Sequence, residues 1–87
     1  MVYLVLEAAA VSEAIDIAKQ SGAAVWVGSD ALTDDELLCL RVEKGLNLTR
    51  FTYPLSHASS ETIEKAIATV VEHHPNETLW IQHPALP

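Results

Sequence analysis

Four histidines are the side chains of this sequence with the clearest potential for metal or acid-base chemistry. His73 and His74 are adjacent near the end of a predicted helix, where successive side chains point about 100° apart. Two such imidazoles cannot ligate one metal ion, and no other Cys or His pair completes a zinc site. We therefore expect no metal site, and expect the two imidazoles to lie at the helix end whose dipole favours positive charge.

A serine-rich segment surrounds the third histidine, His57, just before the last predicted helix. A Ser-His pair can activate a nucleophile, and a helix start can hold an anion. No nucleophile-elbow signature is present, however, so helix capping is the simpler interpretation. The fourth histidine, His83, lies in a C-terminal tail with two prolines. The sequence leaves open whether His57 or His83 has a chemical role.

The remaining candidate groups are an acidic run and a single cysteine, Cys39. Asp30 and the segment 34–36 lack the spaced oxygens and glycine of a calcium loop, so a solvated loop that starts a helix is expected. One cysteine excludes an intramolecular disulfide, and its apolar neighbours predict a small buried side chain. The three glycines are not clustered, so no phosphate cradle is predicted. We expect no cofactor, and the sequence favours a non-catalytic protein.

Charge and hydropathy narrow the class of partner. The 87 residues carry 5 basic and 12 acidic side chains, and the net charge of −7 opposes binding to phosphate backbones. No apolar stretch approaches the ~20 residues that span a bilayer. The first residues lack the basic start of a signal peptide. We therefore expect a cytoplasmic protein without nucleic-acid or membrane partners.

The elements that would position these groups form two strand-helix-strand units. Apolar runs predict strands at 2–6 and 23–27, joined by a helix that Ser12 caps and Gly22 ends. A second helix, capped by Ser59 or Ser60, precedes a final strand at 78–82. The apolar residues of this helix recur at helical spacing, at Ile63, Ala66, Ile67, Val70 and Val71.

The middle of the chain is less clear. Thr33 to Glu36 fits a capping box, which would start a helix. The apolar runs on either side of Lys44-Gly45 instead favour a β-hairpin. The sequence leaves open whether residues 37–43 are strand or helix.

Together these elements predict one small α/β domain over residues 1–87. The order βαβ–β–βαβ is typical of a ferredoxin-like α+β sandwich, with a mixed sheet of four to five strands and two helices on one face.

The aromatic residues suggest a function. If each strand alternates, all five aromatics point to the sheet face opposite the helices. We predict that this face binds a protein partner or pairs two copies in a homodimer, since 49% of the residues are hydrophobic. The alternative is a dimeric α+β-barrel enzyme or small-molecule-binding protein with a histidine-rimmed cavity. The predicted partner-binding residues are Tyr3, Trp26, Phe51, Tyr53 and Trp80.

Overall fold

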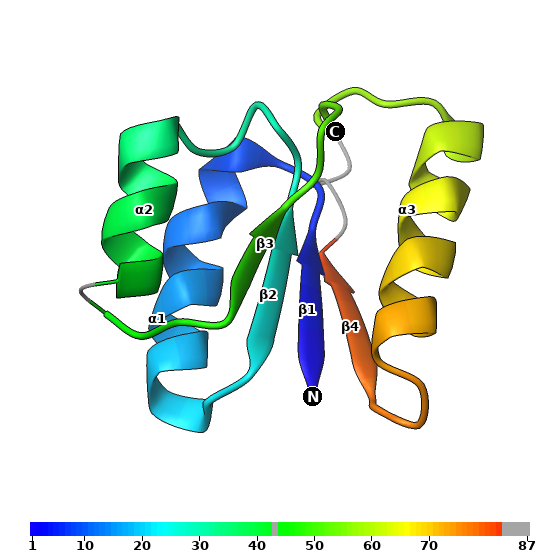
Figure 1. The fold of residues 1–87 in the computed structure, drawn as a ribbon. Helices are drawn as coiled ribbons and strands as arrows, with labels where there is room; N and C mark the ends of the chain where they lie inside the picture. The colour runs from blue at the N-terminus through cyan, green and yellow to red at the C-terminus, as the bar shows by residue number, and fades with distance from the viewer. Residues whose placement is uncertain (43, 83–87) are drawn as a thin grey trace.

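The computed structural model describes residues 1–42 and 44–82, which form four strands, three α-helices and one 3-10 turn (Figure 1). In chain order they are β1 (Val2–Val5), η1 (Ala8–Ala10), α1 (Val11–Ser21), β2 (Ala24–Val27), α2 (Asp34–Val42), β3 (Leu48–Arg50), α3 (Ser60–His73) and β4 (Leu79–Gln82). The strands predicted at 2–6, 23–27 and 78–82 are confirmed to within a residue or two.

The four strands are all parallel, in the order β3-β2-β1-β4. Helices α1 and α2 lie on one face of the sheet, and α3 lies on the other (Figure 1). The predicted ferredoxin-like sandwich is therefore wrong in two respects, the mixed sheet and the single helix-bearing face. Because crossovers between parallel strands are right-handed, helices on outward and return connections take opposite faces. The chain steps outward from β1 to β3 and then returns past β1 to β4.

Helix α2 replaces the predicted hairpin. Its start is the capping box that the sequence indicated: the backbone N–H of Glu36 donates to the Thr33 hydroxyl over 3.1 Å. The Thr33 N–H donates back to the Glu36 carboxylate over 2.9 Å. These bonds lower the pKa of Glu36, the backbone N–H of Thr33 having the largest effect. The local capping interaction thus prevails over the strand propensity of the following residues. Cys39 lies on this helix and is exposed, not buried as predicted.

The other two helices follow the sequence more closely. The Ser59 hydroxyl accepts from the Thr62 N–H and caps α3, as predicted. Gly22 ends α1 with a φ of 74°, in the left-handed region that glycine adopts without strain. Ser12 is not the cap of α1, because η1 leads directly into the helix at Val11.

Strand register divides the aromatic residues between the two faces. Tyr3 is level with Val25 on β2 and with Trp80 on β4, so these three side chains face α1. Leu4 is level with Trp26, and both face α3. The prediction that all five aromatics share one open face is therefore wrong.

Each face has its own core. The face that carries α3 buries Val2, Leu4, Leu6, Ala24, Trp26, Phe51, Leu55, Ala66 and Val70. The face that carries α1 and α2 buries Val5, Val11, Ala14, Ile15, Ala18, Val25, Val27, Leu32 and Leu48. Central strands β1 and β2 are buried on both sides, which explains why their sequences are continuous apolar runs.

Candidate interaction surface

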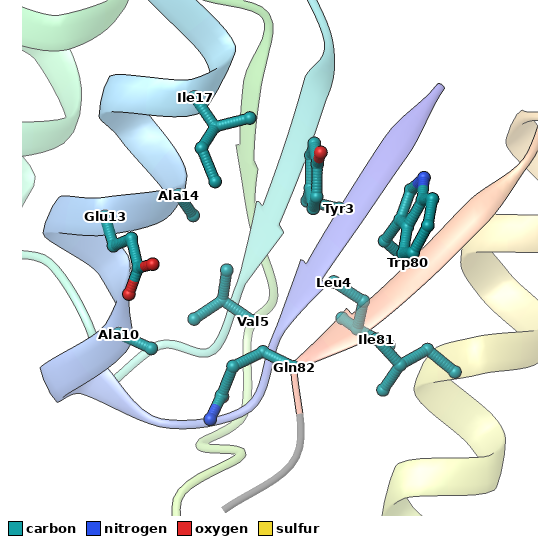
Figure 2. A pocket seen from close by; sticks show the side chains of 10 residues that line it. All are labelled: Tyr3, Leu4, Val5, Ala10, Glu13, Ala14, Ile17, Trp80, Ile81 and Gln82. Carbon is teal, nitrogen blue, oxygen red and sulfur yellow. The ribbon is translucent and has the colours of Figure 1, made fainter.

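Strand β4 is partly uncovered on the face that carries α1. Helix α1 packs against β1 and β2, and α2 packs against β3. Within the described residues no helix covers β4 on this face, and Figure 2 shows the side chains that remain open there. A strand at the edge of a parallel sheet is normally covered on both faces. The face of β4 on the α1 side of the sheet, called the uncovered strip below, is therefore the first candidate for contact with another molecule.

The uncovered strip contains an apolar groove between α1 and β4, with a volume of about 190 Å³. Ala10 of η1, Ala14 of α1 and neighbouring strand residues form its apolar lining, while Glu13 and Gln82 supply its carboxylate and amide groups (Figure 2). The groove is lined by Tyr3, Leu4, Val5, Ala10, Glu13, Ala14, Ile17, Trp80, Ile81 and Gln82.

Two stacked aromatic rings stand at one side of this groove. The rings of Tyr3 and Trp80 lie 6.4 Å apart between centroids, at an interplanar angle of 23°. Trp80 is 53% exposed, and Ile17 across the groove is 37% exposed. An exposed tryptophan on a rigid strand offers a large apolar area at low cost in side-chain entropy, which is why such residues are enriched at binding hot spots.

Within residues 1–42 and 44–82, no strand pairs with the outer edge of β4. The Val2 N–H donates to the carbonyl of Thr78, so alternate residues of this segment direct their backbone groups at β1. Leu79 and Ile81, between them, direct their N–H and C=O groups away from the sheet. The four residues of β4 include no charge and no proline, the usual features that prevent an edge from pairing. This edge is suited to accept another strand.

The opposite edge of the sheet is closed by an arginine. At β3, Val25 N–H donates to the Asn47 carbonyl and Phe51 N–H to the Val27 carbonyl, so Leu48 directs its backbone groups outward. Arg41, from the last turn of α2, donates its Nε–H to the Leu48 carbonyl over 2.6 Å. The two edges of the sheet thus differ: the Arg41 side chain occupies the β3 edge, whereas in the described part of the chain no strand pairs with the β4 edge.

Gln82 fills the position where ligands often bind in open parallel sheets. Such sites lie beyond the carboxyl ends of the strands, at the point where the strand order reverses. In the order β3-β2-β1-β4 that point lies between β1 and β4. The side-chain oxygen of Gln82 accepts from the backbone N–H groups of Leu6 and Glu7, over 3.1 and 3.0 Å. These two backbone N–H groups at the end of β1 are therefore already bonded within the fold.

The three remaining aromatics lie on the α3 face. Trp26 and Phe51 are each 7% exposed and lie 5.3 Å apart, and Tyr53 packs beside Phe51. The structure thus divides the five predicted binding residues, placing Tyr3 and Trp80 at the groove and Trp26 and Phe51 in the core. Partner binding through the half-buried Tyr53 stays a prediction.

His74, at the C-terminal end of α3, forms a hydrogen bond with Trp26. The indole N–H donates to Nε2 of His74 over 3.2 Å, and Nδ1 lies 2.6 Å from a carboxylate oxygen of Glu77. The other Glu77 oxygen accepts from the N-terminal ammonium over 2.9 Å. His73, by contrast, is exposed and its Nδ1 lies 2.9 Å from the Thr69 carbonyl. The paired histidines therefore have different surroundings, as expected of adjacent helix positions that point about 100° apart, although the His73 ring also lies 5.3 Å from that of Trp26.

The serine-rich segment before α3 is bound to the loop after β2. Asp30 accepts from the Leu55 N–H over 3.2 Å. Partial burial raises the pKa of Asp30, but hydrogen bonds from the Ser56 side chain and the Leu55 backbone outweigh it, and the net shift is downward. A Cβ on Gly28 would lie 2.6 Å from the Leu55 nitrogen, so only glycine permits this approach. Ser56 thus bonds to Asp30, and His57 is exposed with a φ of 60°.

Neither a metal-binding cluster nor a membrane-spanning helix is found in residues 1–42 and 44–82. Asp34 of the acidic run pairs with Arg50, which also donates to the Leu32 carbonyl over 2.8 Å. His83 and the C-terminal tail lie outside the described residues. Comparison of the chain with family models, curated proteins and solved structures found no match.

Proposed function

We propose that this protein is an interaction module that binds another protein chain through the β4 surface. The β4 surface comprises the open edge of β4 and the adjoining groove with Tyr3, Ile17 and Trp80. The observation that carries the proposal is the exposed, stacked Trp80 on an edge strand whose outer backbone groups point away from β1. An added strand would gain main-chain hydrogen bonds at the edge and apolar contacts in the groove.

The alternative, a barrel-type enzyme or small-molecule-binding protein, has less support. That arrangement requires two open sheet faces that enclose a cavity between two copies. Here helices lie on both faces, and the groove has Glu13 as its one carboxylate. Gln82 is held by the backbone, and His57 lies in the segment bound to Asp30. We therefore propose a non-catalytic role, and a cytoplasmic location stays a prediction from the sequence.

Site-specific photo-crosslinking tests the proposal. Benzoylphenylalanine would replace Trp80 in one variant and Leu38 in a control, because Leu38 is 62% exposed on α2 and lies away from the β4 surface. After irradiation, position 80 is expected to give protein-protein products, either between copies or with another protein, and position 38 to give few. Equal yields at the two positions would contradict a dedicated surface at β4.

A further inference from the structure

We propose that the partner at the β4 surface is a second copy of this chain, whose β4 pairs antiparallel with the first around a twofold axis perpendicular to the sheet. This inference rests on the proposed function and names the partner. The two four-stranded sheets would join into one sheet of eight strands. The outward backbone groups of Leu79 and Ile81 would hydrogen-bond to those of the other copy.

The closed β3 edge decides between the two ways in which copies can add strands. Pairing β4 of one copy with β3 of the next would leave an open edge at each end and build a filament. Arg41 occupies the Leu48 carbonyl at the β3 edge, where such a contact would form. Pairing β4 with β4 uses the open edge of both copies and leaves none. The structure thus disfavours the filament and permits a closed dimer.

The residues of β4 suit pairing with themselves. Like charges directly opposite one another destabilise an antiparallel pair, and the four residues of β4 carry no charge. The net charge of −7 per copy resides elsewhere in the chain. At physiological ionic strength, exposed charges more than about 8 Å apart are largely screened. Glu13 is the one carboxylate that lines the groove, so most of the repulsion between two acidic copies falls outside the proposed contact.

The twofold axis would also bring the aromatic rings together. An axis perpendicular to the sheet keeps α1 of both copies on the same face, so that the two grooves adjoin. With Leu79 opposite Ile81 of the other copy, Trp80 lies opposite its own counterpart. The backbone groups of Trp80 point at β1, so this is a non-hydrogen-bonded pair, in which Cα atoms approach to about 4.5 Å. The stack of Tyr3 and Trp80 would continue across the axis.

A disulfide across this pair provides the test. Trp80→Cys would be made in a Cys39→Ser background, so that the new thiol is the one cysteine in the chain. A Cα separation of about 4.5 Å lies within the range that a disulfide spans. Mild oxidation is expected to give a covalent dimer of twice 9.5 kDa. Leu38→Cys in the same background is the matched control: its thiol is exposed away from the edge, so mild oxidation should give no covalent dimer although the β4 surface is intact.

Hydrogen exchange of the unmodified chain is a second measurement that does not depend on the variant's folding. The amides of Leu79 and Ile81 should exchange at least tenfold more slowly at high protein concentration than at low, and that of Leu48 should not change. A dimer by mass with neither protection nor a Trp80→Cys crosslink would overturn β4 pairing and leave the proposed function standing. A chain that stays monomeric at millimolar concentration would also overturn the inference. The proposed function would then depend on crosslinks to a different protein at position 80.

Discussion

The indole N–H of Trp26 donates to Nε2 of His74, which joins β2 to the end of α3 over 3.2 Å. Because an indole N–H can only donate, Nε2 must accept. The imidazole is therefore neutral, with its proton on Nδ1 and directed at Glu77. Trp26 on β2 is thus a buried structural residue, whereas Trp80 on β4 is exposed.

Substitution of Trp26 should consequently affect mainly the stability of the fold, and substitution of Trp80 mainly the association of two copies. Trp26→Ser removes a buried ring and leaves His74 without its donor, so the free energy of unfolding should fall by about 3–5 kcal/mol. Trp80→Ser removes a half-exposed ring and should lower stability by about 1 kcal/mol or less. Its main effect should be a weaker dimer. Urea denaturation measures the first effect and light scattering the second; equal destabilisation by both would contradict this assignment.

A proline at the open edge should separate folding from association. The N–H of Leu79 points away from β1, so Leu79→Pro removes a donor that the protein's own sheet does not use. The folded chain should persist, with about 1–2 kcal/mol lost from side-chain packing. Dimerisation should be abolished, as measured by sedimentation equilibrium. Tyr3→Pro, on central β1, is the opposite control and should unfold the protein. A Leu79→Pro variant that still dimerises like the parent chain would exclude edge pairing.

Removal of the arginine that closes the β3 edge should change the type of assembly. Arg41→Ala exposes the Leu48 carbonyl, so β4 of one copy gains a second partner. The expected result is a population of species larger than a dimer whose fraction rises with concentration. Light scattering would detect it. Lys44→Ala removes a cation from the following turn without changing the edge, and should stay dimeric. If Arg41→Ala also gives only dimers, Arg41 is not what prevents head-to-tail pairing.

Acid should destabilise the fold through carboxylates with lowered pKa values: besides Glu36 at the start of α2, these are Glu77 and Asp30, which join segments distant in the sequence. The pKa of Glu77 is lowered first by the N-terminal ammonium and then by His74. That of Asp30 is lowered by hydrogen bonds that outweigh its partial burial. A carboxylate whose pKa is lower in the folded chain than in the unfolded chain stabilises the protein at pH values above its ordinary pKa. This contribution is lost as the pH falls through the lowered folded-state pKa. Those ordinary values are 4.5 for Glu77 and 3.8 for Asp30.

The free energy of unfolding should therefore decrease as pH falls below about 5, when measured by urea denaturation at successive pH values. Glu77→Gln and Asp30→Asn should each make this decrease shallower. A decrease of the same size in the Glu77→Gln, Asp30→Asn double variant would show that other groups govern acid unfolding.

Local interactions determined the parts of the structure that the sequence predicted correctly. The cap at Ser59, the left-handed exit at Gly22 and the capping box at Thr33 each involve residues within a few positions of one another. Their outcome can be predicted from residue types alone. The continuous apolar runs of β1 and β2 were also a usable signal, because strands covered on both faces show this pattern.

Long-range pairing decided what the sequence could not. Whether Trp26 shares a face with Tyr3 depends on the register between β1 and β2, and a shift of one residue moves a side chain to the other face. The position of β4 beside β1, which stacks Trp80 on Tyr3, depends on the return of the chain past the sheet. Arg41 reaches the β3 edge only because α2 is folded there. The β1–β2 and β1–β4 contacts join segments distant in the sequence, whereas Arg41 and Leu48 are seven residues apart and meet through the packing of α2 beside β3. Tertiary packing selects among the alternatives in each case.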